Sequence, residues 1–396
     1  MLRHAVIRPA AALAAALALS SFAASGARAE RKVPQGYIGT VADGVLTDDP
    51  QRFFGQIDTM VGAGVESARI VFDWRDAQPY RRRADVPPEQ AMFFRSESGV
   101  PTDWRSIDAY VEAAARRGMT VLPVMMYAPR WAAKYPGSDP SPPSNFAAYA
   151  KFVAAAAKRY GRSGSFWVER PDVPKIPIVR WQLWNEPHFK EFWSDQPWVK
   201  AYARLLRLTS KVVKQAVPDA KIVAAGMANK SWTYLSMLYA QKTKGFFDYA
   251  AIHPFTNSVD GVVQILEHAR EVMARYRDRK RPMIVSELSW TSAKGKAAYT
   301  YGNERTEAGQ AKALAQGFNR MAKERRRLRI QGVYWYTWMT PDAHELIPFD
   351  YAGVVRLEKD GSVTQKPAFG AYRSTALALE GCAQKGSTAR TCTQRR

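Results

Sequence analysis

The stretch IVRWQLWNEPH, residues 178–188, joins an apolar, strand-like run to an amide, a carboxylate and a proline. The first seven residues have the composition of a buried strand, and the run stops abruptly at Asn185 and Glu186. A buried strand does not normally end on such a pair unless a polar site lies just beyond it. The stretch therefore predicts a strand that delivers a carboxylate to a functional site.

Similar apolar, β-branched runs recur along the chain, and helix-like patterns separate them. The candidate strands are residues 37–42, 67–74, 120–127, 178–184, 221–227, 248–255, 282–290 and 332–339. Near-continuous hydrophobic strands that alternate with helices are typical of a parallel sheet covered on both faces. Eight of them favour a single TIM-type (β/α)8 barrel over an open sheet, and we expect this domain to span residues 30–378.

The first 29 residues have the pattern of an export signal. A positively charged start precedes the short apolar run AALAAALALSSFAA, and Ala-Arg-Ala at residues 27–29 forms a small-x-small cleavage site. We expect cleavage, and a secreted or periplasmic protein. An uncleaved membrane anchor is the alternative, although the run is short for a membrane span.

Both cysteines of the chain, Cys382 and Cys392, lie in a polar C-terminal tail, residues 379–396. In an exported chain, two cysteines that enclose a short segment are most simply a disulfide. A pair of free thiols on a disordered tail is the alternative. Neither interpretation gives a cysteine a part in catalysis.

The formal net charge is +22, and subtracting the three arginines of residues 1–29 leaves +19. Such a charge favours anionic partners, either an anionic polysaccharide or an anionic envelope surface with which the protein associates peripherally. The sequence has no basic recognition helix, RNA-binding aromatic strand or zinc-ligand spacing, so nucleic acid is not the expected partner. For each local cluster, such as Arg81 to Arg83, a solvated basic face is the favoured interpretation.

In a TIM barrel, functional residues gather at the carboxyl ends of the strands. Glu186 ends the fourth candidate strand and Glu287 lies late in the seventh. Strands four and seven lie on opposite sides of a closed barrel, so the two carboxyl groups are expected to face each other. A facing pair of carboxyl groups is what glycoside hydrolysis requires, one protonated and one ionised.

Other chemically distinctive residues fall at equivalent places: Arg69 on strand two, His253 at the end of strand six and Trp338 at the end of strand eight. With WNEP and SELSW, this set resembles the clan A glycoside hydrolases. The wider pattern is most similar to a family 39-like group. That pattern consists of Ala-Pro-Arg-Trp-Ala, a helix ending KRYG, WNEPH, DYAAIHPF, SELSW and DGSVTQKPAFGAY, and it covers residues 37–374.

The resemblance implies a retaining mechanism with a role for each matching position. Glu186 would be the general acid/base and Glu287 the nucleophile. Asn185 would hold the sugar 2-hydroxyl, and Arg69 would orient Glu287 and keep its pKa low. His253 would line the subsite of the reacting sugar, and Trp338 would form its aromatic floor. The two environments are expected to separate the pKa values of the glutamates.

The sequence departs from the family pattern at three places. Strand six has Phe255 where many relatives have a tyrosine that donates to the nucleophile, and Tyr127 and Tyr336 are the candidates to replace that hydroxyl. His188 follows the NEP motif, where a small polar residue is common. No carboxylate or aromatic residue of the first strand receives an assignment.

Several aromatic residues follow strand ends, where they either stack on sugar rings or pack in the core: Trp131, Trp193, Trp290 and Trp338. His188, His268 and His344 lack metal-ligand spacing such as H-E-x-x-H, so we expect no catalytic metal and no cofactor.

The sequence thus predicts a monomeric retaining β-glycosidase that acts on an oligo- or polysaccharide. The alternative is a catalytically impaired barrel that only binds glycans.

Overall fold

The structure, a computed structural model, describes residues 30–138, 140–343 and 346–394. The predicted export signal, residues 1–29, lies outside the described residues. His344, one of the histidines considered for metal binding, lies outside them as well.

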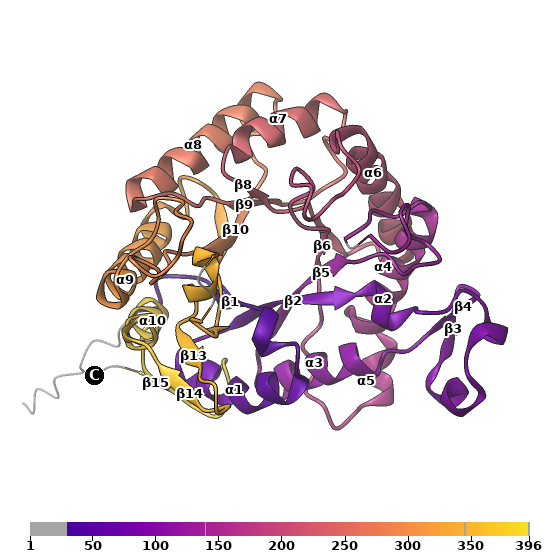
Figure 1. The fold of residues 1–396 in the computed structure, drawn as a ribbon, viewed down its shortest axis with the longest axis horizontal. Helices are drawn as coiled ribbons and strands as arrows, with labels where there is room; N and C mark the ends of the chain where they lie inside the picture. Colours follow the sequence, from indigo (N-terminus) through magenta and orange to yellow (C-terminus); the bar gives the residue numbers. More distant parts are fainter. Residues whose placement is uncertain (1–29, 139, 344–345, 395–396) are drawn as a thin grey trace, which may run out of the picture.

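The described chain forms a parallel (β/α)8 barrel, as predicted (Figure 1). Its strands are β1 (Ile38–Ala42), β2 (Ser67–Asp73), β5 (Thr120–Met126), β6 (Arg180–Leu183), β7 (Lys221–Val223), β8 (Met227–Ala228), β9 (Ala250–His253), β10 (Met283–Leu288) and β11 (Ile330–Trp335). The sheet order is β7-β6-β5-β2-β1-β11-β10-β9-β8. β7 and β8 are two parts of one continuous run that pairs with β6 on one side and β9 on the other, and this run closes the barrel.

A ring of helices surrounds the strands (Figure 1). These helices are α1 (Pro50–Gly62), α3 (Arg105–Arg116), α4 (Phe146–Tyr160), α6 (Val199–Ala216), α7 (Ser231–Ala240), α8 (Val259–Arg275), α9 (Glu307–Glu324) and α10 (Pro367–Glu380). A large hydrophobic core fills the space between helices and strands. Alternating strand residues point to opposite faces, so a second, smaller cluster fills the barrel interior: Val41, Leu122, Val223, Ala251, Ile284 and Tyr334.

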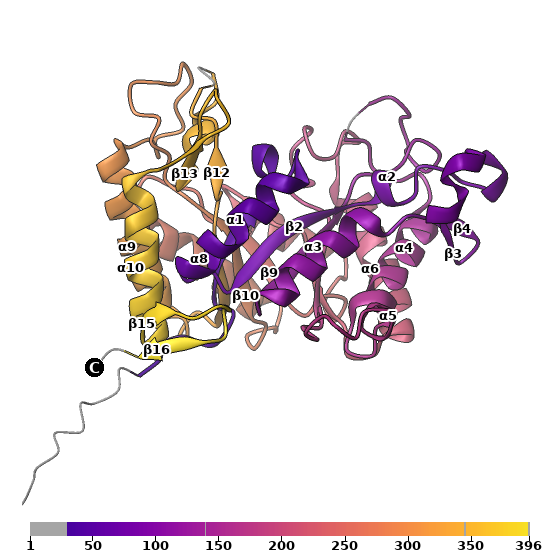
Figure 2. The same cartoon turned by 90° about the horizontal axis from the view of Figure 1, so that it is seen from below.

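Shorter elements decorate the two ends of the barrel. The turn helices are α2 (Trp74–Ala77) and α5 (Ser165–Glu169), and the latter lies in the connection before β6. The short strands β3 (Arg95–Glu97) and β4 (Val100–Thr102) pair in the connection that follows β2. Figure 2 shows β12 (Met339–Thr340) and β13 (Val355–Leu357) at one end of the barrel, where β13 also pairs with β14 (Val363–Gln365).

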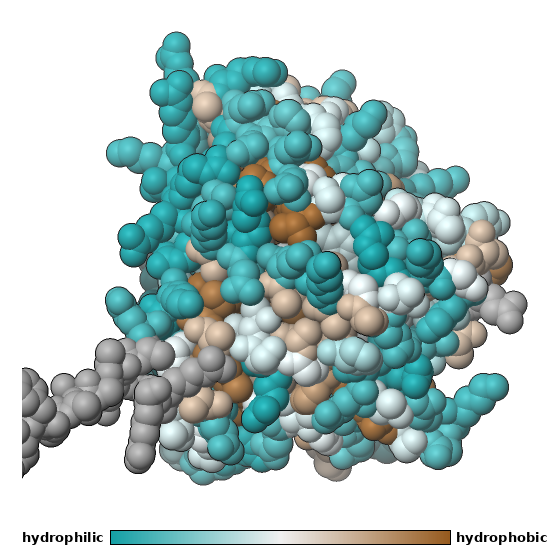
Figure 3. All heavy atoms as spheres, turned by 90° about the vertical axis from the view of Figure 1, so that its left-hand side faces the viewer, coloured by the Kyte–Doolittle hydropathy of each residue, from teal (hydrophilic) through white to brown (hydrophobic). Residues whose placement is uncertain are grey.

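In the described part of the chain, no helix has the length and apolar character needed to cross a bilayer. The face that carries α8, α9 and α10 is mostly hydrophilic, and its apolar atoms form small, separate patches (Figure 3).

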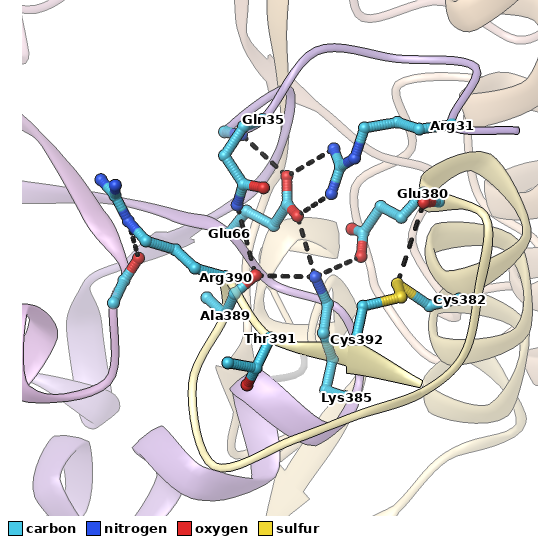
Figure 4. Close-up of polar contacts among 12 residues, drawn as sticks. Arg31, Gln35, Glu66, Glu380, Cys382, Lys385, Ala389, Arg390, Thr391 and Cys392 are labelled. Atoms are coloured by element: carbon cyan, nitrogen blue, oxygen red, sulfur yellow. Dashed lines mark hydrogen bonds and ion pairs between the residues drawn. A yellow bond between two sulfur atoms is a disulfide. The ribbon is translucent and has the colours of Figure 1, made fainter. Parts of the chain in front are cut away.

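The predicted polar tail is an ordered hairpin of β15 (Cys382–Lys385) and β16 (Cys392–Gln394) at the amino-terminal end of the barrel strands (Figures 2 and 4). A disulfide joins Cys382 to Cys392. The buried Lys385 Nζ contacts Glu66 Oε1 at 2.8 Å and Glu380 Oε2 at 2.6 Å, and it donates to the Ala389 carbonyl at 2.8 Å. Residues 379–394 are therefore not an appendage, because a buried cation attaches them to the barrel.

Loss of the Lys385 charge should destabilise the barrel. Lys385→Met removes the lysine from two buried carboxylates, Glu380 and Glu66, of which Glu66 keeps Arg31. Removal of one partner from a buried ion pair costs ~3–5 kcal/mol. We expect the free energy of unfolding in urea at pH 7 to fall by about that amount. The exposed Lys312 provides the matched control, because Lys312→Met should change it by less than ~0.5 kcal/mol. Equal effects of the two substitutions would contradict the assignment.

Candidate active site

The side chains that the sequence singled out converge on the guanidinium of Arg69. This residue shares its register with Val41 and Leu122, which both face the barrel interior, so its side chain also lies inside the barrel. Its NH1 group donates to Glu287 Oε1 at 2.8 Å, and its NH2 group donates to Asn185 Oδ1 at 2.7 Å. All three residues are at most 8 % exposed. Arg69 thus connects strands two, four and seven.

Gln182 completes this network, although no sequence pattern singles it out. Arg69 Nε donates to Gln182 Oε1 at 3.0 Å, and Gln182 Nε2 donates to the Trp184 carbonyl at 3.0 Å. A buried amide on a strand can be recognised as part of a functional site only once its arginine partner is known. Because the Asn185 oxygen accepts from Arg69, its Nδ2 group is the part of the amide that can donate to a sugar hydroxyl.

An irregularity in β10 positions Glu287. Ile284 faces the barrel interior, and strict alternation would turn Glu287 toward the surrounding helices. The register with β11 shifts between Val285 and Leu288, and the Glu287 carboxylate reaches Arg69 inside the barrel. Strand irregularities of this kind re-aim side chains next to active sites.

Glu186 occupies an unusual backbone conformation immediately beyond β6. Its φ is +39° and that of Trp184 is +69°, in the left-handed region that non-glycine residues seldom adopt. The Glu186 N–H donates to the Gly226 carbonyl at 3.1 Å, which holds the turn against the next strand. Backbone strain of this type is concentrated at functional sites.

His253 lies between the two glutamates. Its Nδ1 is 2.7 Å from Glu186 Oε1 and 3.4 Å from Glu287 Oε2. The imidazole is completely buried because Gly226 leaves room for it: a Cβ at that position would lie 2.0 Å from Nε2. One oxygen of each carboxyl group and one nitrogen of His253 all lie within 4.8 Å of one another.

Burial controls the protonation of this centre. It raises the pKa of Glu186 to about 8 and that of Glu287 to about 7, and it lowers the pKa of His253 to about 4. His253 and Arg69 partly offset the increase at Glu287, whereas Arg69 alone does so at Glu186. Glu186 therefore holds its proton more tightly than Glu287, in the order that an acid and a nucleophile require.

The expectation that Arg69 keeps the pKa of Glu287 low is wrong in this structure. The loss of hydration on burial outweighs the attraction of the guanidinium, and the neighbouring Glu186 and Asp43 carboxylates raise the pKa further. The pKa values of the two glutamates still differ, but both lie above the usual range for a carboxyl group.

Asp43 is a component of the site that the sequence analysis missed. It follows β1 directly and accepts a hydrogen bond from Thr337 Oγ1 at 2.7 Å and another from the Tyr336 hydroxyl. Burial raises its pKa, and Arg69 is close enough to oppose that increase. The sequence could have indicated Asp43, because this residue follows the carboxyl end of strand one, where functional residues of a barrel gather.

Tyr336 is the aromatic residue that strand eight contributes to the centre. The charges of Asp43, Glu287 and Glu186 all act to raise the pKa of its hydroxyl, together with burial. This hydroxyl therefore stays protonated and donates to Asp43. Of the two tyrosines proposed to compensate for Phe255, Tyr336 lies beside the glutamates, and the Tyr127 ring lies under the Arg75 guanidinium, 4.2 Å from ring centroid to Cζ.

The prediction that Trp338 forms the aromatic floor is wrong. Its ring is fully buried, packs edge-on against Phe369 and Tyr372 of α10, and donates from Nε1 to Gln56 of α1. Trp290 is also core, because it is 1 % exposed and fills the space left by Gly317 on α9. Neither ring has a free face for a sugar.

The other aromatic candidates differ in their positions. Trp131 is partly exposed, packs edge-on against Trp74 and donates to the Gln78 carbonyl at 2.7 Å. Trp193 is fully buried against Trp184. His188 stacks on Tyr234 with a centroid distance of 4.2 Å, and burial lowers its pKa to about 3, so it remains neutral. Trp131 therefore remains a candidate for sugar stacking, whereas Trp193 packs in the core.

Glu186, His253 and Glu287 are also the described residues whose ligand atoms lie close enough together to hold a metal ion. Arg69 and Asn185 lie next to this group, and the Arg69 NH1 group donates a hydrogen bond to Glu287 Oε1. A divalent cation would therefore lie next to a fixed guanidinium charge, which opposes metal binding.

A separate cavity of about 670 Å³ lies at the amino-terminal ends of α4 and α6. Its lining includes Lys134, Lys200, Arg204 and Asp195, and it does not include the two glutamates. Lys134 pairs with Asp195 at 2.7 Å. The cavity thus presents an excess of positive charge on the same side of the barrel as the site.

No protein-family model matches the sequence. Among solved structures, a family 39 glycoside hydrolase from Bacteroides cellulosilyticus is 20% identical with a TM-score of 0.61, covering 88% of this chain and 64% of that one. A monomeric β-xylosidase from Caulobacter crescentus is 18% identical with a TM-score of 0.58, covering 87% and 69%. A glucosidase from Croceicoccus marinus is 16% identical with a TM-score of 0.62, covering 90% and 70%.

The chain spans about two thirds of the length of these proteins, 64% in the first case. Similar structures also include glycoside hydrolases of families 51 and 5. At these identities the similarity concerns the fold. This chain therefore has the barrel fold of clan A glycoside hydrolases, with family 39 enzymes among its structural neighbours.

Proposed function

We propose that this protein is a retaining glycoside hydrolase that cleaves β-glycosidic bonds by double displacement. The observation that carries the proposal is the pair of buried glutamates, Glu186 and Glu287, at the carboxyl ends of strands four and seven of the barrel. Arg69 binds one of them and His253 contacts both.

In the first step, ionised Glu287 attacks the anomeric carbon and forms a glycosyl–enzyme ester. Glu186 gives its proton to the leaving oxygen, so the glycosidic C–O bond breaks and the leaving group departs neutral. In the second step, Glu186 takes a proton from water, which attacks the anomeric carbon and releases Glu287. Asn185 donates from Nδ2 to a hydroxyl of the reacting sugar.

The separation of the carboxyl groups supports retention. Carboxyl groups ~5–5.5 Å apart are typical of retaining enzymes, and inverting enzymes need ~6.5–9.5 Å to admit a water molecule. Here an oxygen of Glu186 and an oxygen of Glu287 lie within 4.8 Å of each other.

We further propose an anionic oligo- or polysaccharide as the substrate and an extracellular or periplasmic location for a protein that acts as a monomer. The sequence charge of +22 and the basic cavity with Lys200 and Arg204 support the anionic substrate. The signal-like residues 1–29 support the location. Endo or exo action stays open in this proposal.

Removal of either carboxyl group should abolish hydrolysis. Purified full-length protein is incubated with plant and bacterial polysaccharides, both neutral and anionic, and new reducing ends are assayed. Glu186→Gln should lower kcat by on the order of 10²–10⁴, because it removes the general acid and base. Glu287→Gln should lower it further, since no ester can form. The exposed Glu89 provides a carboxylate control, and Glu89→Gln should leave kcat unchanged.

Glu186→Gln should also be less impaired on an aryl glycoside with a good leaving group, which departs without a proton. A wild-type protein that binds a polysaccharide but releases no reducing ends would contradict the hydrolase and favour a glycan-binding barrel.

The pH dependence should identify both groups. Activity requires Glu287 ionised, with a pKa of about 7, and Glu186 protonated, with a pKa of about 8. The kcat/KM profile should therefore rise through pH 7 and fall above pH 8, since it reports the free enzyme. With an activated aryl glycoside, Glu186→Gln should remove the falling limb and leave the rising limb. An optimum below pH 6 would be inconsistent with this assignment.

A further inference from the structure

An apolar patch of exposed side chains lies on two connections at the carboxyl end of the barrel. Tyr299 and Tyr301, on the connection after β10, are 64 % and 61 % exposed. Leu346 and Ile347, on the connection between β12 and β13, are 49 % and 44 % exposed. The Tyr299 N–H donates to the Leu346 carbonyl at 3.4 Å, so the two connections lie side by side. Exposed apolar side chains gathered in this way mark binding surfaces.

A continuous series of ring contacts connects this patch to the candidate active site. Tyr301 lies over Phe349 with centroids 5.7 Å apart. Phe349 in turn contacts Phe255 at 5.0 Å and Tyr336 at 5.7 Å. Phe255 contacts His253, the residue between the two glutamates, at 6.2 Å. We call Phe255, Tyr336, Phe349 and Tyr301 the aromatic rim.

The base of the rim is fixed by a buried cation. Lys366 Nζ donates to Ser292 Oγ at 2.8 Å and to the Tyr351 carbonyl at 3.1 Å, and it pairs with Asp342 at 2.9 Å. These three partners come from the same two connections that carry Tyr301 and Phe349 of the rim. The Glu304 carboxylate also accepts from the Tyr301 N–H at 2.5 Å. The rim is therefore held in place before any ligand arrives, which reduces the entropic cost of binding.

We propose that the aromatic rim is a carbohydrate-binding subsite, on which a sugar unit adjacent to the one held by the glutamates stacks. Aromatic faces bury the apolar C–H faces of sugar rings, and tyrosine also offers a hydroxyl for hydrogen bonding. The continuity of the rim with His253 favours a glycan chain over a protein partner. The inference rests on the proposed function, because it assigns the rim to the same substrate.

The test measures binding apart from catalysis. Full-length protein carrying Glu287→Gln is titrated with the β-1,4-linked hexasaccharides xylohexaose, cellohexaose and hexamannuronate by calorimetry. On the hexasaccharide that binds best, Tyr301→Ala should raise the Kd about tenfold, as expected for the loss of one aromatic stacking contact. Tyr301→Phe keeps the ring and should stay within about twofold. Met237→Ala, which removes an apolar side chain on α7 that is 39 % exposed, should have no effect.

The possible outcomes separate the subsite from the reaction. Cleavage by the wild type combined with an unchanged Kd for Tyr301→Ala overturns the subsite and leaves the hydrolase intact. A tenfold loss of binding in a wild-type protein that never cleaves supports the subsite and overturns the hydrolase. Failure of all three hexasaccharides to bind contradicts the subsite. A concentration-dependent dimer that Tyr301→Ala dissociates, with sugar binding unchanged, shows instead that the patch is a protein interface.

Discussion

The arrangement of the candidate site depends on the hydrogen bonds of the Arg69 guanidinium. One planar fork binds the carboxylate of strand seven, the amide oxygen at the end of strand four and the amide oxygen of Gln182. These partners come from both sides of the barrel, so the relative positions of Glu287 and Asn185 are set by a single rigid group. A lysine, with one compact ammonium on a flexible stem, would not fix three acceptors in this geometry.

The same cation contributes to the protonation pattern of the centre. Glu186, Glu287 and Asp43 lie near one another and near Arg69, and burial disfavours a charge on each of them. His253 and Arg69 both act to lower the pKa of Glu287, whereas Arg69 alone does so at Glu186. Glu287 therefore ionises more easily than Glu186. The proposed nucleophile and the proposed acid are thus distinguished by their positions relative to Arg69 and His253.

Much of the fold could be predicted because parallel barrel strands are buried on both faces and appear as continuous apolar runs. Glu186, Glu287, Asn185, Arg69 and His253 could be selected because strand ends in a barrel all meet at one mouth, and the structure brings these five together. Position along the chain does not reveal the direction of a side chain, and that is why Trp338 and Trp290 were misassigned.

On strand eight, Tyr336 faces the interior and Trp338 packs against α10. Alternation along a strand would place these two rings on the same face, and it does not apply here because β11 ends at Trp335. The C-terminal hairpin was missed for a related reason. Its polar composition resembles a tail, and its attachment depends on a buried pairing between Lys385 and Glu66, 319 residues apart. Contacts between distant charged residues leave no local pattern.

The most direct test of the account is the stereochemistry of the first product. A polysaccharide or aryl β-glycoside that the enzyme cleaves is hydrolysed in D₂O, and the anomeric protons are followed by NMR before mutarotation. The facing glutamates predict that the β-anomer appears first, because two displacements restore the original configuration. Initial formation of the α-anomer would show inversion and contradict the assignment of Glu287 as a nucleophile.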